Sequence, residues 1–401
     1  MSQKLPVVIA GAGPTGLMCA LGLARRGVPV IVCEAERSLP HDLRAGSFHP
    51  PTQELMAPYG ITERMHEHGL RVGRWQIRSR RGGMVAEFDL GLLADVTPYP
   101  YRLHLEQHRL TPIQLDILRR EAAADVYFGH RVTGFEQKDG AVVVHTESEG
   151  IPGKLEASWL IGADGGRSTI RKLLPVEFEG FTWPEQFLVV STPYDLGAHG
   201  FTLNAYIADP VEWAAVFKMP DAGPPGLWRL ALPCDPGLPD DALLDPAAVQ
   251  RRMKGLFGDE TFEIRYQSIY RVHQRVASEW RHGRVLLAGD AAHLNNPLGG
   301  FGLNSGIHDA VNLAEKLAAV WRGEAGEALV DRYVRQRRAT TIDQVQAMSI
   351  RNKRLLEERD PAVQKSRMEE LMATAADAQR ARQFLLESSM IAGLKKSLAI
   401  E

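Results

Sequence analysis

This sequence has few cysteines, little net charge and no long apolar run. It has 401 residues but only three cysteines, without a CxxC spacing, which predicts free thiols and a reducing, cytoplasmic setting. Its formal net charge of −2 gives no bulk attraction to nucleic acid or to an anionic membrane. No apolar run reaches the ~18 residues of a membrane helix, and the first residues lack the pattern of a secretory signal. We therefore expect no membrane span and no nucleic-acid partner.

Metal-ligand spacing is also absent. The 13 histidines are scattered along the chain, without HExxH or a comparable pattern, so we predict no metal site. We find no Ser-His-Asp nucleophile either. The apolar, aromatic and charged fractions are those of an ordinary globular protein, and the length allows about two domains.

The first part of the chain has the pattern of a strand, a glycine turn, a helix and a second strand. Residues 5–10 form a continuous apolar run, which is typical of a parallel strand covered on both faces. Residues 17–26 are rich in alanine and leucine and end at Gly27, a residue that commonly follows a helix. Residues 28–33 predict the second strand. The segment is therefore predicted to be a right-handed βαβ unit.

Within that unit, Gly-Ala-Gly-Pro-Thr-Gly matches the dinucleotide fingerprint GxGxxG. Gly11 permits the tight turn, Gly13 admits a pyrophosphate, and Gly16 allows close packing of helix on strand. Glu34 follows Gly11 by 23 residues and is placed to accept hydrogen bonds from ribose hydroxyls. The predicted cofactor-binding residues are Gly11, Gly13, Pro14, Thr15, Gly16 and Glu34. This pattern alone does not separate FAD from NAD.

Two later glycine motifs favour flavin. GADGGRS at residues 162–168 and GDAAH at residues 289–293 each follow an apolar strand. A plain nicotinamide dehydrogenase needs neither, whereas FAD has ribityl hydroxyls that Asp290 can bind. PLGGFGLN at residues 297–304 leads into a predicted helix, where its N–H groups can stabilise negative charge on a reduced flavin. The loop at residues 297–304, taken alone, would equally suit a helix start with a mobile lid. The residues predicted to contact FAD here are Asp290, Gly300, Gly302, Leu303 and Asn304.

Together these residues resemble the p-hydroxybenzoate-hydroxylase-like family of single-component FAD-dependent monooxygenases. The resemblance covers about residues 5–345 and rests on GAGPTG, GADGGRS and GDAAHLNNPLGGFGLNSG in that order. It implies that Arg44 lies near the flavin and its phosphates and that Gln107 lies in the flavin pocket. It also implies that Asp164 belongs to a motif shared between FAD and reduced nicotinamide.

The chemistry implied by the resemblance is hydroxylation of a small phenolic or heteroaromatic substrate with O2 and NAD(P)H, by way of a flavin C4a-hydroperoxide. FAD carries this chemistry, and the protein orients it and excludes water. Because there is no second GxGxxG, NAD(P)H is expected to visit the flavin groove transiently. Pro297 is implied to line the reaction site with its carbonyl toward the substrate. Phe301 stands where the family often has Gln or Met, so a different pocket shape near the flavin is expected.

A substrate hydroxyl must lose or share its proton before it is attacked. His273 is one candidate base, because it precedes the return to the flavin domain and its pKa range is suitable. A structural hydrogen-bonding role is the other interpretation of His273. Tyr206 is a further candidate, as are Tyr194 and His293. The residues predicted to be catalytic are His273, Pro297 and Tyr206.

We predict an α/β fold with a Rossmann-like FAD-binding domain of glutathione-reductase type, an inserted, mainly antiparallel β substrate domain, and C-terminal helices. One helix is expected over residues 111–124, with Pro112 near its start. The segments assigned to the FAD-binding domain are 1–70, 98–180 and 271–345; those of the substrate-binding β domain are 71–97 and 181–270; the C-terminal helical segment is 346–401.

Other functions share parts of this pattern. A flavin-dependent halogenase has the same fold, but it would be expected to carry a WxWxIP segment, which is absent here. A flavoprotein epoxidase, another non-aromatic oxygenase or a flavin-dependent reductase is not separated from a hydroxylase by the flavin motifs. A non-catalytic interaction protein using the C-terminal helices would bind no FAD. For assembly, monomer and homodimer both remain open.

Overall fold

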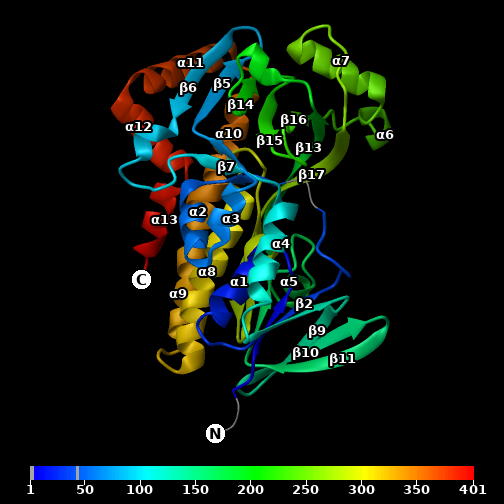
Figure 1. The fold of residues 1–401 in the computed structure, drawn as a ribbon, viewed down its shortest axis with the longest axis vertical. Coiled ribbons are helices and arrows are strands. Elements are labelled where there is room, and N and C mark those ends of the chain that lie inside the picture. Colours follow the sequence, from blue (N-terminus) through cyan, green and yellow to red (C-terminus); the bar gives the residue numbers. More distant parts are fainter. Residues whose placement is uncertain (1–3, 42–44) are drawn as a thin grey trace.

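The computed structural model describes residues 4–41 and 45–401 (Figure 1). A six-stranded sheet has the strand order β18-β19-β12-β1-β2-β8. Neighbouring strands are parallel except at one edge, where β18 pairs antiparallel with β19. The bounds are β1 (Val7–Ala10), β2 (Val30–Glu34), β8 (Ala124–Phe128), β12 (Trp159–Gly162), β18 (Arg281–His282) and β19 (Val285–Leu287).

This sheet is covered by helices and by a second, smaller sheet. All four residues of β1 are buried, as its unbroken apolar sequence predicts for a central parallel strand. Helix α1 packs against α4 and α8, and the antiparallel sheet β11-β10-β9 contacts β1, β2 and β12. The bounds are α1 (Pro14–Ala24), α4 (Gln107–Leu118), α8 (Phe301–Arg322), β9 (Arg131–Lys138), β10 (Ala141–Ser148) and β11 (Ile151–Ala157).

An eight-stranded sheet forms the other end of the molecule, at the top of Figure 1. Its order is β20-β17-β13-β16-β15-β14-β5-β6, and all neighbours are antiparallel except β14 and β5. The bounds are β5 (Arg74–Ser79), β6 (Gly83–Asp89), β13 (Phe178–Thr192), β14 (Asn204–Ala208), β15 (Ala214–Met219), β16 (Leu227–Pro233), β17 (Tyr266–Ala277) and β20 (His293–Leu294). Apart from β4 (Leu70–Val72), the strands of segments 71–97 and 181–270 thus share one sheet.

Two long strands connect the two ends of the molecule. β13 and β17 pair antiparallel from Phe178 with Ala277 to Ser191 with Tyr266. The predicted boundaries after residues 180 and 270 therefore fall inside strands rather than in loops. A continuous strand pair fixes the position of one sheet relative to the other more firmly than a loop would.

The remaining elements surround these sheets. A three-stranded sheet, β3-β7-β4, consists of β3 (Ser47–Phe48), β7 (Arg102–His104) and β4 (Leu70–Val72). The C-terminal part continues from α9 through a π-helical turn, η5, into four more helices. The helices are α2 (Pro50–Met56), α3 (Ile61–His66), α5 (Thr169–Leu173), α6 (Asp240–Leu243), α7 (Pro246–Phe257), α9 (Ala328–Thr340), η5 (Thr341–Gln346), α10 (Ala347–Leu356), α11 (Pro361–Ala376), α12 (Ala378–Ser388) and α13 (Ile391–Leu398). Short 3-10 turns are η1 (Ala57–Tyr59), η2 (Leu90–Leu93), η3 (Leu196–His199) and η4 (Gly289–Ala291).

The helix expected over residues 111–124 is shifted toward the N-terminus. It begins at Gln107 and ends at Leu118, so Pro112 lies inside it rather than near its start. A proline within a helix removes one backbone donor, a loss that burial of an apolar face can offset. Leu110, Ile113 and Ile117 supply that buried face.

Three large clusters of buried apolar side chains form the core. The largest lies between the six-stranded sheet and its helices, and includes Leu17 and Leu313. The second lies between the eight-stranded sheet and the C-terminal helices, and includes Trp75 and Leu385. A smaller one lies between the eight-stranded sheet and α7, and includes Met253. Among the described residues, none of the helices combines the length and the apolarity that crossing a membrane requires.

Candidate active site

The turn after β1 is crowded at two glycines and open at the third. A Cβ atom on Gly11 would lie 2.5 Å from the carbonyl oxygen of Ala163, and one on Gly16 would lie 2.0 Å from that of Gly11. By contrast, no atom lies within 4 Å of the Cβ position of Gly13. The turn therefore packs tightly against β12 but leaves open space beside Gly13. That space fits the pyrophosphate of a dinucleotide.

Glu34 ends β2 beside this turn. Its carboxylate accepts hydrogen bonds from the N–H groups of Ala12, at 2.7 Å, and Glu36, at 2.9 Å. These bonds hold the carboxylate at the tip of the strand, where a ribose would approach. A groove continues from this tip and is lined by residues that include Arg37 and Phe128.

Thr15 brings the first and third motifs together. Its hydroxyl would lie 2.5 Å from a Cβ atom on Gly289 and 2.4 Å from one on Gly306, so no larger residue fits at either position without a shift. Asp290, the next residue after Gly289, is exposed. The start of α1, the GDAAH motif and α8 thus meet, with Asp290 accessible to a ligand.

The second motif is joined to the third by Arg171. Its guanidinium donates hydrogen bonds to the carbonyls of Gly166, at 2.7 Å, and Ala291, at 2.9 Å. Burial lowers the pKa of Arg171, while nearby carboxylates act in the opposite direction. The carboxylate of Asp164 caps α5 by accepting from the N–H of Thr169 at 2.7 Å. Asp164 therefore supports its own loop, and its contact with a nicotinamide stays a prediction.

The loop before α8 contains a tight turn. The carbonyl of Pro297 accepts a hydrogen bond from the N–H of Gly300 at 2.9 Å, and Gly299 and Gly300 have φ values of 111° and 71°. A carbonyl engaged in this way points into the turn. A carbonyl oxygen has two lone pairs, so contact of the Pro297 carbonyl with the substrate stays a prediction.

Asn304 anchors the first turn of α8. Its amide nitrogen donates to the carbonyls of Ser47, at 2.7 Å, and Gly300, at 2.5 Å, while its oxygen accepts from the N–H of His49 at 2.9 Å. The N–H groups of Gly302 and Leu303 lie in the first helical turn and have no acceptor within the helix. Their predicted role in stabilising negative charge on a reduced flavin stays a prediction.

Gln107 is the first residue of α4, and its N–H donates to the carbonyl of Ala45 at 3.0 Å. The start of α4 therefore lies beside the segment that leads into β3. Arg44 lies outside the described residues.

Two of the three predicted catalytic residues lie at the Pro297 turn. The Tyr206 hydroxyl accepts a hydrogen bond from the N–H of Gly299 at 3.2 Å. His273 is on the other face of β17: its ring bonds to Thr182, whereas the adjacent Gln274 points toward the turn and donates to Ser349. The structure therefore does not bring His273 together with Tyr206, since successive side chains of a strand alternate between its faces.

A cluster of buried polar side chains beside Tyr206 was missed by the sequence reasoning. Arg102 donates to Asn204 at 2.8 Å and stacks over Trp75, with 5.3 Å from the guanidinium carbon to the ring centroid. No carboxylate among the described residues lies within ion-pair distance of Arg102, which is 3% exposed. Buried donor or acceptor atoms left unpartnered here are Arg102 Nε, His104 Nε2, Trp75 Nε1, Asn204 Nδ2 and His49 Nδ1. The alternation of Arg102 and His104 in a short apolar strand was the available signal.

Burial makes the histidines of this cluster weak bases. It lowers the pKa of His104 to about 4, although a bond to the Lys218 carbonyl acts in the opposite direction. Burial and the charge of Arg102 also hold the pKa of His49 well below its usual range. Burial lowers the pKa of Arg102 itself. Both rings are therefore neutral near pH 7, and Arg102 supplies the positive charge of the cluster.

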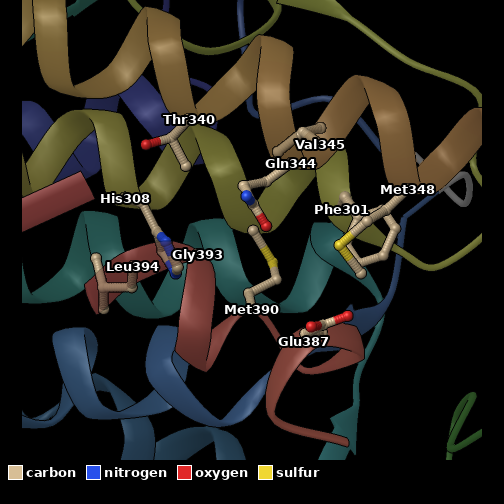
Figure 2. A pocket seen from close by; sticks show the side chains of 10 residues that line it. All are labelled: Phe301, His308, Thr340, Gln344, Val345, Met348, Glu387, Met390, Gly393 and Leu394. Atoms are coloured by element: carbon tan, nitrogen blue, oxygen red, sulfur yellow. The ribbon is translucent and has the colours of Figure 1, made fainter. Parts of the chain in front are cut away.

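A second pocket lies between α8 and the C-terminal helices (Figure 2). Phe301 points into it and packs with Val345, Met348 and Met390. Phe301 is also stacked on the His49 ring, with 5.5 Å between ring centroids. Its side chain therefore contacts both the helical C-terminal part and His49. The different pocket shape expected near the flavin stays a prediction.

The three cysteines are free and buried. Burial raises the pKa of Cys33 to about 11, so its thiol is protonated near neutral pH. Within residues 4–41 and 45–401, no group of three or more His, Cys, Asp or Glu side chains is arranged to hold a metal ion.

Comparison with known proteins places this site in context. Residues 4–348 match the family model described as an FAD binding domain. The chain is 35% identical over 391 residues to para-nitrophenol 4-monooxygenase of Pseudomonas sp. (strain WBC-3), with 96% of each chain covered. It is 33% identical over 365 residues to 6-hydroxy-3-succinoylpyridine 3-monooxygenase of Pseudomonas putida, covering 90% of this chain and 91% of the relative.

The fold is also similar to a solved structure. The p-nitrophenol 4-monooxygenase of Pseudomonas putida DLL-E4 superposes with a TM-score of 0.92 at 32% identity. The match covers 98% of this chain and 99% of that one. The likeness therefore includes the C-terminal helices as well as the two sheets.

Proposed function

Because the chain belongs to the FAD-binding-domain family of flavin-dependent aromatic monooxygenases, we propose that it hydroxylates a phenol bound as its phenolate beside Arg102. The FAD cofactor, the monooxygenase activity and the aromatic substrate class, each predicted from the sequence, are confirmed by these relatives. The halogenase, reductase and non-aromatic alternatives do not fit them.

The observation that carries the substrate proposal is the buried charge of Arg102. A buried cation without a carboxylate partner is costly, and a bound anion would offset that cost. Arg102 lies next to Tyr206, which in turn bonds to the Pro297 turn. Two relatives are named for p-nitrophenol and 6-hydroxy-3-succinoylpyridine, and both compounds carry a ring hydroxyl. Among possible bound anions, a phenolate oxygen suits the buried site beside Arg102 and Tyr206 best.

The residues proposed to hold FAD are Gly11, Gly13, Pro14, Thr15, Gly16, Glu34, Arg44, Gln107, Asp164, Asp290, Gly300, Gly302, Leu303 and Asn304. When bound, FAD supplies hydride acceptance and oxygen activation. The open space at Gly13 would admit the pyrophosphate, Glu34 the ribose, and Asp290 the ribityl hydroxyls. NAD(P)H and O2 are proposed as co-substrates, with NAD(P)H visiting the same groove transiently. We propose a cytoplasmic location, and a monomer or a homodimer.

The chain's own part in the reaction is to bind, ionise and shield the substrate. Arg102 would favour the phenolate over the phenol by its charge, which makes the ring more electron-rich for hydroxylation. Tyr206 would orient the same oxygen, and Pro297 would form part of the reaction-site wall. His273 retains a proposed catalytic role only if a movement brings it to the other face of β17. His49 and His104 both lie near Arg102. They are therefore the histidines that we propose to contact the substrate.

The proposal is tested by anaerobic reduction of the bound flavin with NADH or NADPH. Each reaction is run alone, with para-nitrophenol, and with para-nitroanisole, which has the same ring but no ionisable hydroxyl. We expect para-nitrophenol to accelerate bleaching of the flavin band many-fold and para-nitroanisole to have no effect. Equal rates in all three reactions would contradict phenolate recognition.

A variant pair then tests Arg102. Arg102→Met should weaken para-nitrophenol binding by about 10- to 100-fold, because a charge-assisted hydrogen bond contributes about 1.5–3 kcal/mol. Arg74→Met is the matched control, since Arg74 is exposed on β5 and pairs with Glu87 at the surface. Unchanged binding in Arg102→Met would remove the phenolate site from this position.

A further inference from the structure

Gln274 is a buried amide whose hydrogen-bonding atoms are all engaged. Its oxygen accepts from the backbone N–H of Asn296 at 3.1 Å, the Asn296 side-chain amide at 3.2 Å and the indole N–H of Trp183 at 3.4 Å. Its nitrogen donates to Ser349 at 3.0 Å and to the Gln346 oxygen. Gln274 is only 3% exposed. A fully satisfied buried network of this kind favours one arrangement of the groups it joins.

The segment that Gln274 contacts leads directly into the Pro297 turn. The Asn296 oxygen accepts from the N–H of Leu298 at 3.1 Å, and the Leu298 carbonyl accepts from Asn352 at 3.2 Å. On the preceding side, Gln346 donates to the Leu294 carbonyl at 2.9 Å. On both sides of Pro297, backbone groups are therefore hydrogen-bonded to side chains.

Beyond the turn, the same chain reaches the proposed reaction site. The N–H of Gly299 is bound by Tyr206 at 3.2 Å, and its carbonyl is bound by the ring of His49 at 2.8 Å. A movement of Asn296 would therefore be passed through Pro297 to Tyr206. No side-chain atom of Gln274 bonds to Tyr206 directly.

The π-helical turn η5 supports the other side of the network. It spans Thr341–Gln346 between α9 and α10, and Gln346 is its last residue. A π-helical turn holds one more residue than an α-helical turn, is uncommon, and often lies at functional sites. Here it brings Gln346 to the Gln274 amide and to the Leu294 carbonyl.

We propose that Gln274 is a positioning residue that holds the Pro297 turn against the bound substrate, so that oxygen is used for hydroxylation and not wasted. This rests on the proposed function, which places the reaction beside that turn. When the turn is displaced, NAD(P)H, a proton and O2 would yield NAD(P)+ and H2O2, with the phenol unchanged. Two electrons pass from NAD(P)H to O2 in that route, and both oxygen atoms leave in the peroxide.

The experiment compares Gln274→Leu with Gln267→Leu in the FAD-loaded enzyme. Gln267 lies on the same strand, and its side chain donates one hydrogen bond to the Leu244 carbonyl, away from the turn. The first readout is hydrogen exchange of the peptide covering Asn296 to Gly300, which needs no substrate. The second is the amount of hydroxylated product and of H2O2 formed per NAD(P)H consumed with para-nitrophenol. Gln274→Glu keeps the shape and one acceptor oxygen for Asn296, and it serves as the conservative variant.

Gln274→Leu is expected to exchange at least ten-fold faster over Asn296 to Gly300, and to form several-fold less product per NAD(P)H, with H2O2 making up the difference. FAD content and the rate of NAD(P)H consumption should stay within about two-fold, because the nucleotide turn at Gly11 is untouched. Gln274→Glu should fall between the parent and Gln274→Leu, and Gln267→Leu should match the parent.

Three results would overturn the proposal: unchanged exchange in Gln274→Leu, unchanged coupling despite faster exchange, or equal losses in Gln267→Leu. If Gln274→Leu does not fold, Gln274→Glu decides by the same two readouts. If the parent does not hydroxylate para-nitrophenol, the result counts against the proposed function and leaves the positioning role to be decided separately. The visible circular dichroism of bound FAD then replaces coupling as the second readout, and a spectrum identical to the parent in Gln274→Leu would overturn the positioning role.

Discussion

The carboxylate of Asp309 lies 2.7 Å from the Nε atom of Arg337, and both side chains are almost completely buried. Its second oxygen accepts from the ring of His293 at 2.9 Å and from the N–H of Gly289 at 3.1 Å. Burial alone would raise the pKa of Asp309, but the charge of Arg337 and the hydrogen bonds from Arg337 and His293 outweigh it and hold the pKa at about 2. The ion pair thus fixes the turn that presents Asp290.

Arg337→Met should lower the free energy of unfolding by about 3–5 kcal/mol, because it leaves the Asp309 charge buried without its partner. Urea unfolding of the two proteins at pH 7 measures the difference. Arg335→Met is the control, since Arg335 is exposed on the same helix and bonds to the carbonyl of Glu401. A loss in Arg337→Met no larger than in the control would contradict the role given to the pair.

The positions of the nucleotide motifs could be predicted because their function depends on backbone geometry. Gly11 and Gly16 are needed wherever a strand turns this tightly into a helix, so local sequence is sufficient to locate them. The β17 site shows the limit of such reasoning. The chemistry of His273 makes it a candidate base, but the side of a strand that a residue faces is set by tertiary contacts, here the pairing of β17 with β13 and the bonds of Gln274 to Asn296.

Arg102 and His104 show a second limit. Their strand, β7, has only three residues, and it lies next to Tyr206 through packing of segments that are about a hundred residues apart. Local sequence cannot report such distant contacts. The use of FAD was nevertheless predictable from the flavin motifs, because the cofactor carries the chemistry. The aromatic substrate class followed from the family resemblance and not from the motifs themselves.

Gly13→Ala and Gly16→Ala are expected to separate cofactor binding from folding. A Cβ atom on Gly13 meets no protein atom within 4 Å and can only obstruct the pyrophosphate. Gly13→Ala should therefore weaken FAD binding by about 10- to 100-fold, because overpacking costs about 1–3 kcal/mol. The stability of the FAD-free protein should be unchanged. Gly16→Ala should destabilise the FAD-free protein as well, because its Cβ would lie 2.0 Å from the Gly11 carbonyl oxygen. Flavin titration and thermal unfolding measure the two effects, and normal FAD loading in Gly13→Ala would disprove the fingerprint assignment.

Asp290→Ala should weaken FAD binding by about ten-fold or more, since hydrogen bonds to a charged group contribute about 1.5–3 kcal/mol. The exposed side chain follows Gly289 at the place where α1 meets α8. Quenching of flavin fluorescence during titration measures the dissociation constant. Asp290→Asn keeps an acceptor oxygen and should lose less affinity than Asp290→Ala. Equal affinity in all three proteins would exclude Asp290 from the ribityl site.

The protein should lose stability steeply as the pH falls from about 6.5 toward 4, because folding buries neutral histidines. Burial lowers the pKa of His104 to about 4 and that of His308 to about 3, and it holds the pKa of His49 well below its usual range. The unfolded chain binds protons at these sites first, so their contribution is complete above the unfolded pKa of about 6.5 and falls as pH drops toward the folded values. Each such histidine lowers the free energy of unfolding by about 1.4 kcal/mol per pH unit in that window.

Urea unfolding of the FAD-free protein at pH 7.5, 6 and 5 measures this slope. His308→Gln should flatten it by about 1.4 kcal/mol per pH unit, because glutamine does not take up a proton in this range and its amide can still bond to Thr52. His68→Gln is the control, since His68 is exposed and its replacement should leave the slope unchanged. Asp309 does not contribute in this window: its depressed pKa makes its stabilisation complete above about 4, and that stabilisation is lost only as the pH falls toward 2. A slope that is the same in the parent and in His308→Gln would show that His308 is not held neutral by the fold.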